Sequence, residues 1–163
     1  MRLAKKTVEA FVRRGEIFMP KRLTPEMKQQ AGVFVSIHKG EELRGCIGTF
    51  EPQHHNVALE IVANALGSAS HDPRFSPVTK NELRHLSYSI DVLSPPQRVT
   101  SLDQLDPKRY GVIVEAGWRK GLLLPDLEGV NSVEEQVGIC RLKAGLEPDE
   151  PVTLYRFEVK RYS

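Results

Sequence analysis

Cysteine is scarce in this sequence, and long apolar runs are missing from it. The 163 residues include only two cysteines, Cys46 and Cys140, which lie far apart and form no cluster with the spacing of metal ligands. Such usage argues against a disulfide-stapled scaffold and is typical of a reducing cytoplasm. No apolar run approaches the roughly 20 residues that span a bilayer, and no apolar segment follows the charged start of the chain. We therefore expect neither a membrane anchor nor a signal peptide.

An excess of charge of one sign is also lacking. The formal net charge is only +2 at pH 7, so the sequence neither requires nor excludes a nucleic-acid partner. Hydrophobic residues make up 40% of the chain and charged residues 27%, which is ordinary for a globular protein. The length suits one domain, residues 1–163, with a core of its own. We expect a soluble, cytoplasmic, single-domain protein.

The sequence motifs of several common chemistries are absent as well. There is no HExxH or CxxC motif, and the adjacent His54 and His55 would point in different directions on a helix. A phosphate-binding loop, a dinucleotide fingerprint and a Gly-x-Ser-x-Gly elbow are also missing. The sequence therefore predicts no metal and no cofactor.

Apolar periodicity predicts helices and strands in irregular alternation. Helices are expected over residues 2–14, from Pro52 to the turn at His71, and after a capping box formed by Ser132 and Glu135. Strands are expected over 33–38, 43–50, 87–92, 111–115, 121–124 and 153–159, the first two as a hairpin. Because no regular βαβ alternation appears, the pattern predicts an α+β fold around an antiparallel sheet.

One predicted strand has an unusual composition for a strand that only packs. In residues 43–50, LRGCIGTF, strand alternation places Arg44, Cys46 and Gly48 on one face. A guanidinium two residues from a thiol can stabilise a thiolate, and Gly48 would leave open space beside the sulfur. The helix that follows would add its N-terminal dipole if it points toward this face. The segment is our first candidate for a functional site.

Cys46 has two interpretations. Free cysteine is often a small buried hydrophobe, and reactivity requires exposure that a sequence does not reveal. At a functional site it would be either a nucleophile or part of a pocket wall. A thiol nucleophile normally has a base within hydrogen-bond reach, and His71, in a turn, is the best local candidate.

Arginines supply the other candidate chemistry. The planar forks of Arg44 and Arg74 match a carboxylate or phosphate, but either could instead pair with a local acid such as Glu42 or Glu51. Asp72 would bond the backbone of its own turn or brace one of these arginines. If both arginines converge beside the thiol, they form an anion site.

The segment of residues 43–50 resembles the AMMECR family, named for the AMME chromosomal region candidate protein. Its microbial members are called protein A of the AmmeMemoRadiSam system. Further similar motifs follow in family order along nearly the whole chain: Asn64-Ala65, residues 68–75 (SASHDPRF), 92–96 (VLSPP), 121–125 (GLLLP), 143–146 (KAGL) and 154–157 (LYRF). The family more often has a basic residue such as arginine at the position of His71, which weakens a Cys46–His71 pair.

This resemblance implies a larger part that holds both termini, a smaller part from the middle of the chain, and a groove between them. A groove of that kind would be a natural place for a ligand. The family context implies work in a modification pathway with two partners, a Memo-like protein and a radical S-adenosylmethionine protein.

Two functions follow from these observations. In the first, the chain is an enzyme or enzyme component whose pocket takes a small anionic or nucleotide-like ligand. Cys46 and His71 are then the catalytic candidates, and the ligand-binding candidates are Arg44, Gly45, Gly48, Asp72 and Arg74. In the second, the chain is a binding or adaptor module for a protein or nucleic acid. Trp118, at a predicted hairpin tip, would either anchor such a partner or fold back onto the sheet.

Overall fold

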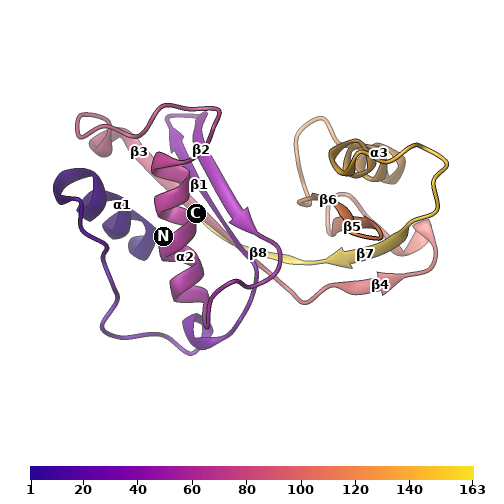
Figure 1. The fold of residues 1–163 in the computed structure, drawn as a ribbon, viewed down its shortest axis with the longest axis horizontal. Helices are drawn as coiled ribbons and strands as arrows, with labels where there is room; N and C mark the ends of the chain where they lie inside the picture. Colours follow the sequence, from indigo (N-terminus) through magenta and orange to yellow (C-terminus); the bar gives the residue numbers. More distant parts are fainter. The chain divides into compact units, whose positions relative to one another are not determined.

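The computed structural model describes all 163 residues, which form two units. The first unit comprises residues 1–93 and 160–163, and the second comprises residues 94–159. Both termini therefore belong to the first unit, and the second is built from the middle of the chain (Figure 1). This confirms the α+β class and the division into a larger and a smaller part. None of the α-helices is long and apolar enough to cross a membrane.

The first unit contains a four-stranded antiparallel sheet covered by helices. The order of its strands is β2 (Glu42–Thr49), β1 (Val33–Lys39), β3 (Leu86–Leu93) and β8 (Val159–Tyr162). Helix α2 (Val57–Ser70) packs against β1 and β2, and α1 (Arg2–Arg14) packs against α2 (Figure 1). The inward residues of β1 are fully buried at alternate positions, Val33, Val35 and Ile37, as the sequence pattern predicts. This core fixes the edge strand β2, which carries Cys46.

Helix α2 begins later than expected. The sequence predicts a start at Pro52, but Asn56 is the N-cap, and its side chain accepts a hydrogen bond from Leu59 N–H at 3.0 Å. The segment before it is held by the buried carboxylate of Glu60, which accepts a hydrogen bond from His54 N–H at 2.6 Å. A side chain from inside the helix thus organises the residues that the sequence assigned to its first turn.

The second unit has a four-stranded antiparallel sheet of its own. The order of its strands is β4 (Gln97–Val99), β7 (Thr153–Phe157), β5 (Gly111–Ala116) and β6 (Arg119–Leu123), and α3 (Val133–Ala144) packs on β5 and β6 (Figure 1). The predicted capping box of α3 is present, with Ser132 accepting from Glu135 N–H at 3.1 Å. The core contains Val112, Val114 and Cys140, all without exposed surface. Two strands were not predicted as such: β4 was missed, and the single last strand is divided into β7 and β8.

Candidate functional site

Cys46 lies on the edge strand of the first sheet. It is opposite Ser36 of β1, and the Ser36 hydroxyl donates a hydrogen bond to the Cys46 sulfur at 3.2 Å. The residue is half-buried, whereas Cys140 is fully buried. Burial raises the pKa of the Cys140 thiol to about 12. Cys46 is therefore the cysteine that a reagent or ligand can reach.

The main chain of Cys46 is held by one turn after α2. Its N–H donates to Asp72 Oδ2 at 2.8 Å, and its carbonyl accepts from Arg74 Nη2 at 3.3 Å. Both main-chain groups thus face away from β1, which makes Cys46–Ser36 a non-hydrogen-bonded pair, the kind in which opposite side chains lie closer. The turn takes the place of a neighbouring strand at this point of the edge.

Asp72 and Arg74 form the centre of this arrangement. Asp72 is 4% exposed and accepts from Arg74 Nε at 3.0 Å and from Arg74 Nη2 at 2.7 Å. It also accepts from the main-chain N–H of Arg74 at 3.1 Å. Hydrogen bonds from the Arg74 guanidinium hold the pKa of the Asp72 carboxyl well below its usual value. Asp72 therefore has both of the roles considered from the sequence, bonding its own turn and bracing an arginine. We call the Asp72–Arg74 pair and its two bonds to Cys46 the clamp.

Arg44 is paired with an acid that is distant in sequence. Its Nε donates to Glu82 Oε1 at 2.8 Å and its Nη2 to Glu82 Oε2 at 3.3 Å, rather than to Glu42 or Glu51. The Arg44 side chain is 13% exposed, and its Nη1 is buried without a partner. Hydrogen bonding from Arg44 lowers the pKa of Glu82 to about 2.

Both guanidiniums contact the ring of Phe75, and an anion site formed by the two arginines stays a prediction. Arg44 and Arg74 lie 5.9 Å and 5.4 Å from the centroid of the Phe75 ring. A β-bulge contributes to this placement. Ile37 pairs with Gly45 and His38 with Leu43, so Arg44 is the extra residue of β2. Strict alternation, on which the sequence analysis relied, is interrupted there.

The two glycines of β2 are explained by close packing. A Cβ on Gly45 would lie 2.1 Å from the carbonyl oxygen of Ser68 in α2, and a Cβ on Gly48 would lie 2.2 Å from the ring of Phe34. The open space expected beside the sulfur at Gly48 is thus filled by Phe34. A ligand-binding role for Gly45 and Gly48 stays a prediction.

The sequence left open which end of α2 lies nearest Cys46. Ser68, in the last turn of α2, donates to Val35 O at 2.7 Å and accepts from Ile47 N–H at 2.8 Å. The C-terminal end of α2 therefore lies beside Cys46, so its dipole does not favour an anion there. His71 is the residue after the helix, and its Nδ1 lies 2.7 Å from Ser70 Oγ. No hydrogen bond joins His71 to Cys46.

Ser36 and Glu82 are the members of this site that sequence reasoning missed. Ser36 could have been found from the hairpin register, because it pairs with Cys46. Glu82 offered no such signal, since it lies 38 residues from Arg44. No group of three or more His, Cys, Asp or Glu side chains is placed to hold a metal ion.

Comparison with known proteins supplies a family. The family model AMMECR1 matches residues 1–162. A protein from Thermotoga maritima is 52% identical over 161 residues, which cover 96% of this chain and 92% of that protein. A protein from Clostridium acetobutylicum is 46% identical over 99% of this chain, but the chain spans only 35% of that longer protein.

A solved structure agrees with these sequence matches. The crystal structure of an uncharacterized protein from Pyrococcus horikoshii matches 98% of this chain and 87% of its own, with a TM-score of 0.89 and 33% identity. It therefore has the same fold over almost the whole length of both. The resemblance first noted in β2 holds from end to end, and the chain belongs to the AMMECR1 family.

Proposed function

We propose that the chain is a component of a modification pathway and binds a small anionic or nucleotide-like ligand at Cys46. The family context suggests the pathway, and the clamp is the observation that supports a ligand site at Cys46. A buried carboxylate and an arginine hold both main-chain groups of one half-buried cysteine. The clamp places the partly exposed Arg74 guanidinium beside Cys46.

The arginines have different roles in this proposal. The Arg44 side chain is 13% exposed and bound to Glu82, so it positions Phe75 and the strand. The Arg74 side chain is 55% exposed, so its guanidinium can meet a ligand oxygen while Asp72 holds its inner edge. Cys46 then lies beside the bound anion. Because His71 makes no hydrogen bond to the thiol, a pocket-wall role for Cys46 fits the geometry better than a Cys–His nucleophile.

The charge around Cys46 can be tested with two alkylating reagents. Iodoacetate is an anion and iodoacetamide is neutral, so the ratio of their rates at Cys46, divided by the ratio for a free thiol, reports the local potential. We expect a normalised ratio above about 3, falling to about 1 or below in Arg74→Gln, where the Asp72 carboxylate is left without its cation. Mass spectrometry of the intact chain counts the labels, and a single label is assigned to Cys46 because Cys140 is buried.

The control variant is Arg98→Gln, which removes the same charge from an exposed residue of the second unit. We expect it to leave the ratio unchanged. AMP at about 5 mM should slow labelling of Cys46 in the parent chain but not in Arg74→Gln. A ratio near 1 in the parent chain, together with no protection by AMP, would contradict the proposal.

The adaptor function is the second candidate, and one observation favours it. Trp118 is 89% exposed at the turn between β5 and β6, where Gly117 has a φ of +60°. It is therefore not folded back onto the sheet. Exposed tryptophans are frequent anchors at protein interfaces. The partner that the family context supplies is a Memo-like protein, with the radical S-adenosylmethionine protein as the other.

This candidate has its own test. Purified chain and purified Memo-like protein are mixed and followed by sedimentation velocity. A complex that is lost in Trp118→Ala but kept in Arg74→Gln would support the adaptor function. If no complex forms at about 50 µM of each protein, the adaptor function is excluded.

A further inference from the structure

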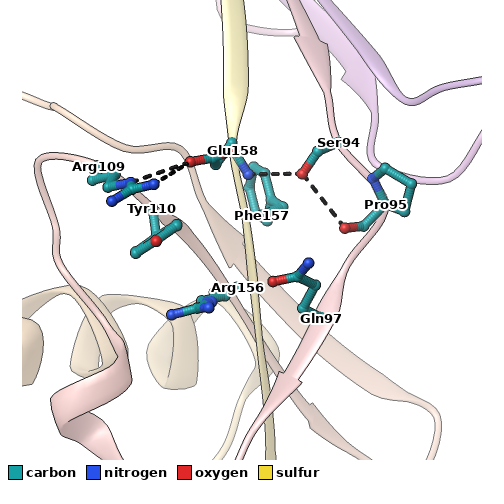
Figure 2. Close-up of a pocket in the computed structure, with 8 residues that line it drawn as sticks. All are labelled: Ser94, Pro95, Gln97, Arg109, Tyr110, Arg156, Phe157 and Glu158. Atoms are coloured by element: carbon teal, nitrogen blue, oxygen red, sulfur yellow. Dashed lines mark hydrogen bonds and ion pairs between the residues drawn. The ribbon is translucent and has the colours of Figure 1, made fainter.

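A cavity that does not include Cys46 lies wholly within the second unit. It has a volume of about 370 Å³ and is shown with its lining side chains in Figure 2. The lining residues come from the start of β4, the end of β7 and the segment before β5: Ser94, Pro95, Gln97, Arg109, Tyr110, Arg156, Phe157 and Glu158. A volume of this size suits a small organic ligand.

The cavity exists because β4 and β7 are forced apart. Gln97 pairs with Arg156, and the next contact is between Ser94 and Glu158, where Ser94 N–H donates to the Glu158 carbonyl at 2.9 Å. Two prolines, residues 95 and 96, therefore lie opposite one residue, Phe157. Proline has no N–H to donate, and two residues opposite one make a bulge. The gap in the pairing is thus built into the sequence.

Arg156 has the one guanidinium in this cavity without a carboxylate partner. Its Nη1 donates to the Gln104 carbonyl at 2.7 Å, but its Nε is buried and makes no hydrogen bond. The guanidinium lies 4.5 Å from the centroid of the Tyr110 ring. A buried N–H without an acceptor is unfavourable, so an oxygen that reached it would be bound with some advantage.

Other arginines of this chain show which oxygen suits that edge. Arg44, Arg74, Arg109 and Arg161 each present Nε and Nη2 to one carboxylate, those of Glu82, Asp72, Glu158 and Asp91. The same edge of Arg156 is empty. A planar carboxylate fits it in the two-point fashion that a guanidinium favours.

The remaining lining groups narrow the class of ligand. Arg109 is already paired with Glu158 at 3.1 Å, so the cavity has one uncompensated positive charge, that of Arg156. Tyr110 and Pro95 supply flat apolar surfaces. The side-chain amide of Gln97 makes no hydrogen bond within the chain. Figure 2 shows Tyr110 between the side chains of Arg109 and Arg156, with Gln97 beside Arg156.

We propose that this cavity binds a small monocarboxylate that carries an amide and a flat apolar group. The carboxylate lies on the Nε–Nη2 edge of Arg156, the amide of the ligand bonds Gln97, and the apolar group lies against Pro95 and Tyr110. Because Nε lies beneath the surface, the guanidinium turns outward from Tyr110 when the ligand binds. This site is independent of Cys46 and of the function proposed for it.

Hippurate is the probe, since it combines a carboxylate, an amide and a phenyl ring. Full-length ¹⁵N-labelled chain is titrated while the arginine Nε–H resonances are observed, and the Arg156 signal is assigned by its loss in Arg156→Lys. We expect saturable binding with a Kd of about 1 mM or tighter and a downfield shift of the Arg156 Nε–H. Backbone amides of Gln97 and Tyr110 should shift with the same Kd.

Variants and analogues decide the outcome. Arg156→Lys keeps the charge but not the fork, and should weaken hippurate binding about tenfold or more. Arg98→Lys, a neighbour in β4 that does not line the cavity, should bind within about twofold of the parent chain. The neutral hippuramide should not bind.

The proposal would be overturned by the absence of a saturable shift up to about 20 mM hippurate, by equal binding of hippuramide, or by equal binding of hippurate to a folded Arg156→Lys variant. Tighter binding of phenyl phosphate than of hippurate would also overturn it, because the site would then be one for phosphate.

Discussion

The two units of this chain use arginine in different ways. In the first unit, Arg44 and Arg74 are bound by carboxylates that are largely buried, and they hold the strand and turn around Cys46. In the second, Arg119 is bound by the partly buried Glu150, but the carboxylate of Glu158 is 56% exposed and Arg156 has no carboxylate at all. A guanidinium whose Nε–Nη2 edge is filled from inside the fold supports structure and, as in Arg74, offers a ligand only its outer side. In Arg156 the Nε–Nη2 edge itself is open.

The largest expected effect comes from breaking the clamp. Asp72→Ala leaves Arg74 and two main-chain groups without their acceptor, so we expect a loss of about 3 kcal/mol in the free energy of unfolding. Glu158→Ala removes the corresponding partner of Arg109 in the second unit, where both side chains are exposed, and should cost less than about 1 kcal/mol. Urea unfolding measures both. Equal losses would end the contrast between the units.

Acid should weaken the first unit through Glu82. Hydrogen bonding from Arg44 lowers its pKa from 4.5 to about 2. A lowered pKa means that the stabilisation is complete above the unfolded value and is lost as the pH falls from about 4.5 to about 2, by at most about 3 kcal/mol. Glu82→Gln should flatten this part of the stability curve. Urea unfolding at a series of pH values from 7 to 2 tests it, and parallel curves for the two proteins would contradict it.

Glycine substitutions compare how closely helix and sheet approach in each unit. A Cβ on Gly45 would meet Ser68 O at 2.1 Å, and a Cβ on Gly121 would meet Cys140 O. Alanine at either position should lower the free energy of unfolding by about 2 kcal/mol, because the backbone of the facing helix must move to make room for the Cβ. Gly138→Ala is the control, because Gly138 lies in α3 with open space around it. This substitution should raise the free energy of unfolding by about 0.5–1 kcal/mol.

These variants can be localised by amide hydrogen exchange. Gly45→Ala should reduce protection in the first unit, and Gly121→Ala should reduce it in the second. A uniform loss over the whole chain in both variants would show that the two units unfold as one.

The smallest expected effect is that of Trp118→Ala. Its side chain is 89% exposed, so the free energy of unfolding should change by less than about 0.5 kcal/mol. Urea unfolding of the variant provides the measurement. A loss above about 1 kcal/mol would show that Trp118 packs against the chain, and the argument for a docking role would disappear.

Local patterns made much of the fold predictable. The helix α1, the β1–β2 hairpin and the capping box of α3 each depend on residues a few positions apart, and each is present. The predicted start of α2 was wrong, because Glu60 holds the segment before the helix by contacts that periodicity does not encode. The division after β7 was missed because alternation continues through residues 153–159, whereas the pairing partner changes.

The candidate site was predictable in composition but not in geometry. Asp72 and Arg74 contact Cys46, and Arg44 and Arg74 contact Phe75, but the turn chemistry of residues 72–75 predicted only a turn and did not place it beside β2. The partner of Arg44 was beyond reach, because Glu82 is brought near only by tertiary folding. The Arg156 cavity was also beyond reach, since it depends on a gap between two strands that the sequence did not identify as neighbours.

The Ser94–Glu158 contact has a consequence for how the chain can be rearranged. The chain leaves the first unit after Leu93 and returns at Lys160, and Ser94 N–H donates to the Glu158 carbonyl at 2.9 Å. The second unit therefore enters and leaves through two hydrogen-bonded neighbours, as an inserted module does. This meets the geometric condition for transplantation: residues 94–159 could be excised and replaced by a tight turn, or grafted into the hairpin of another host.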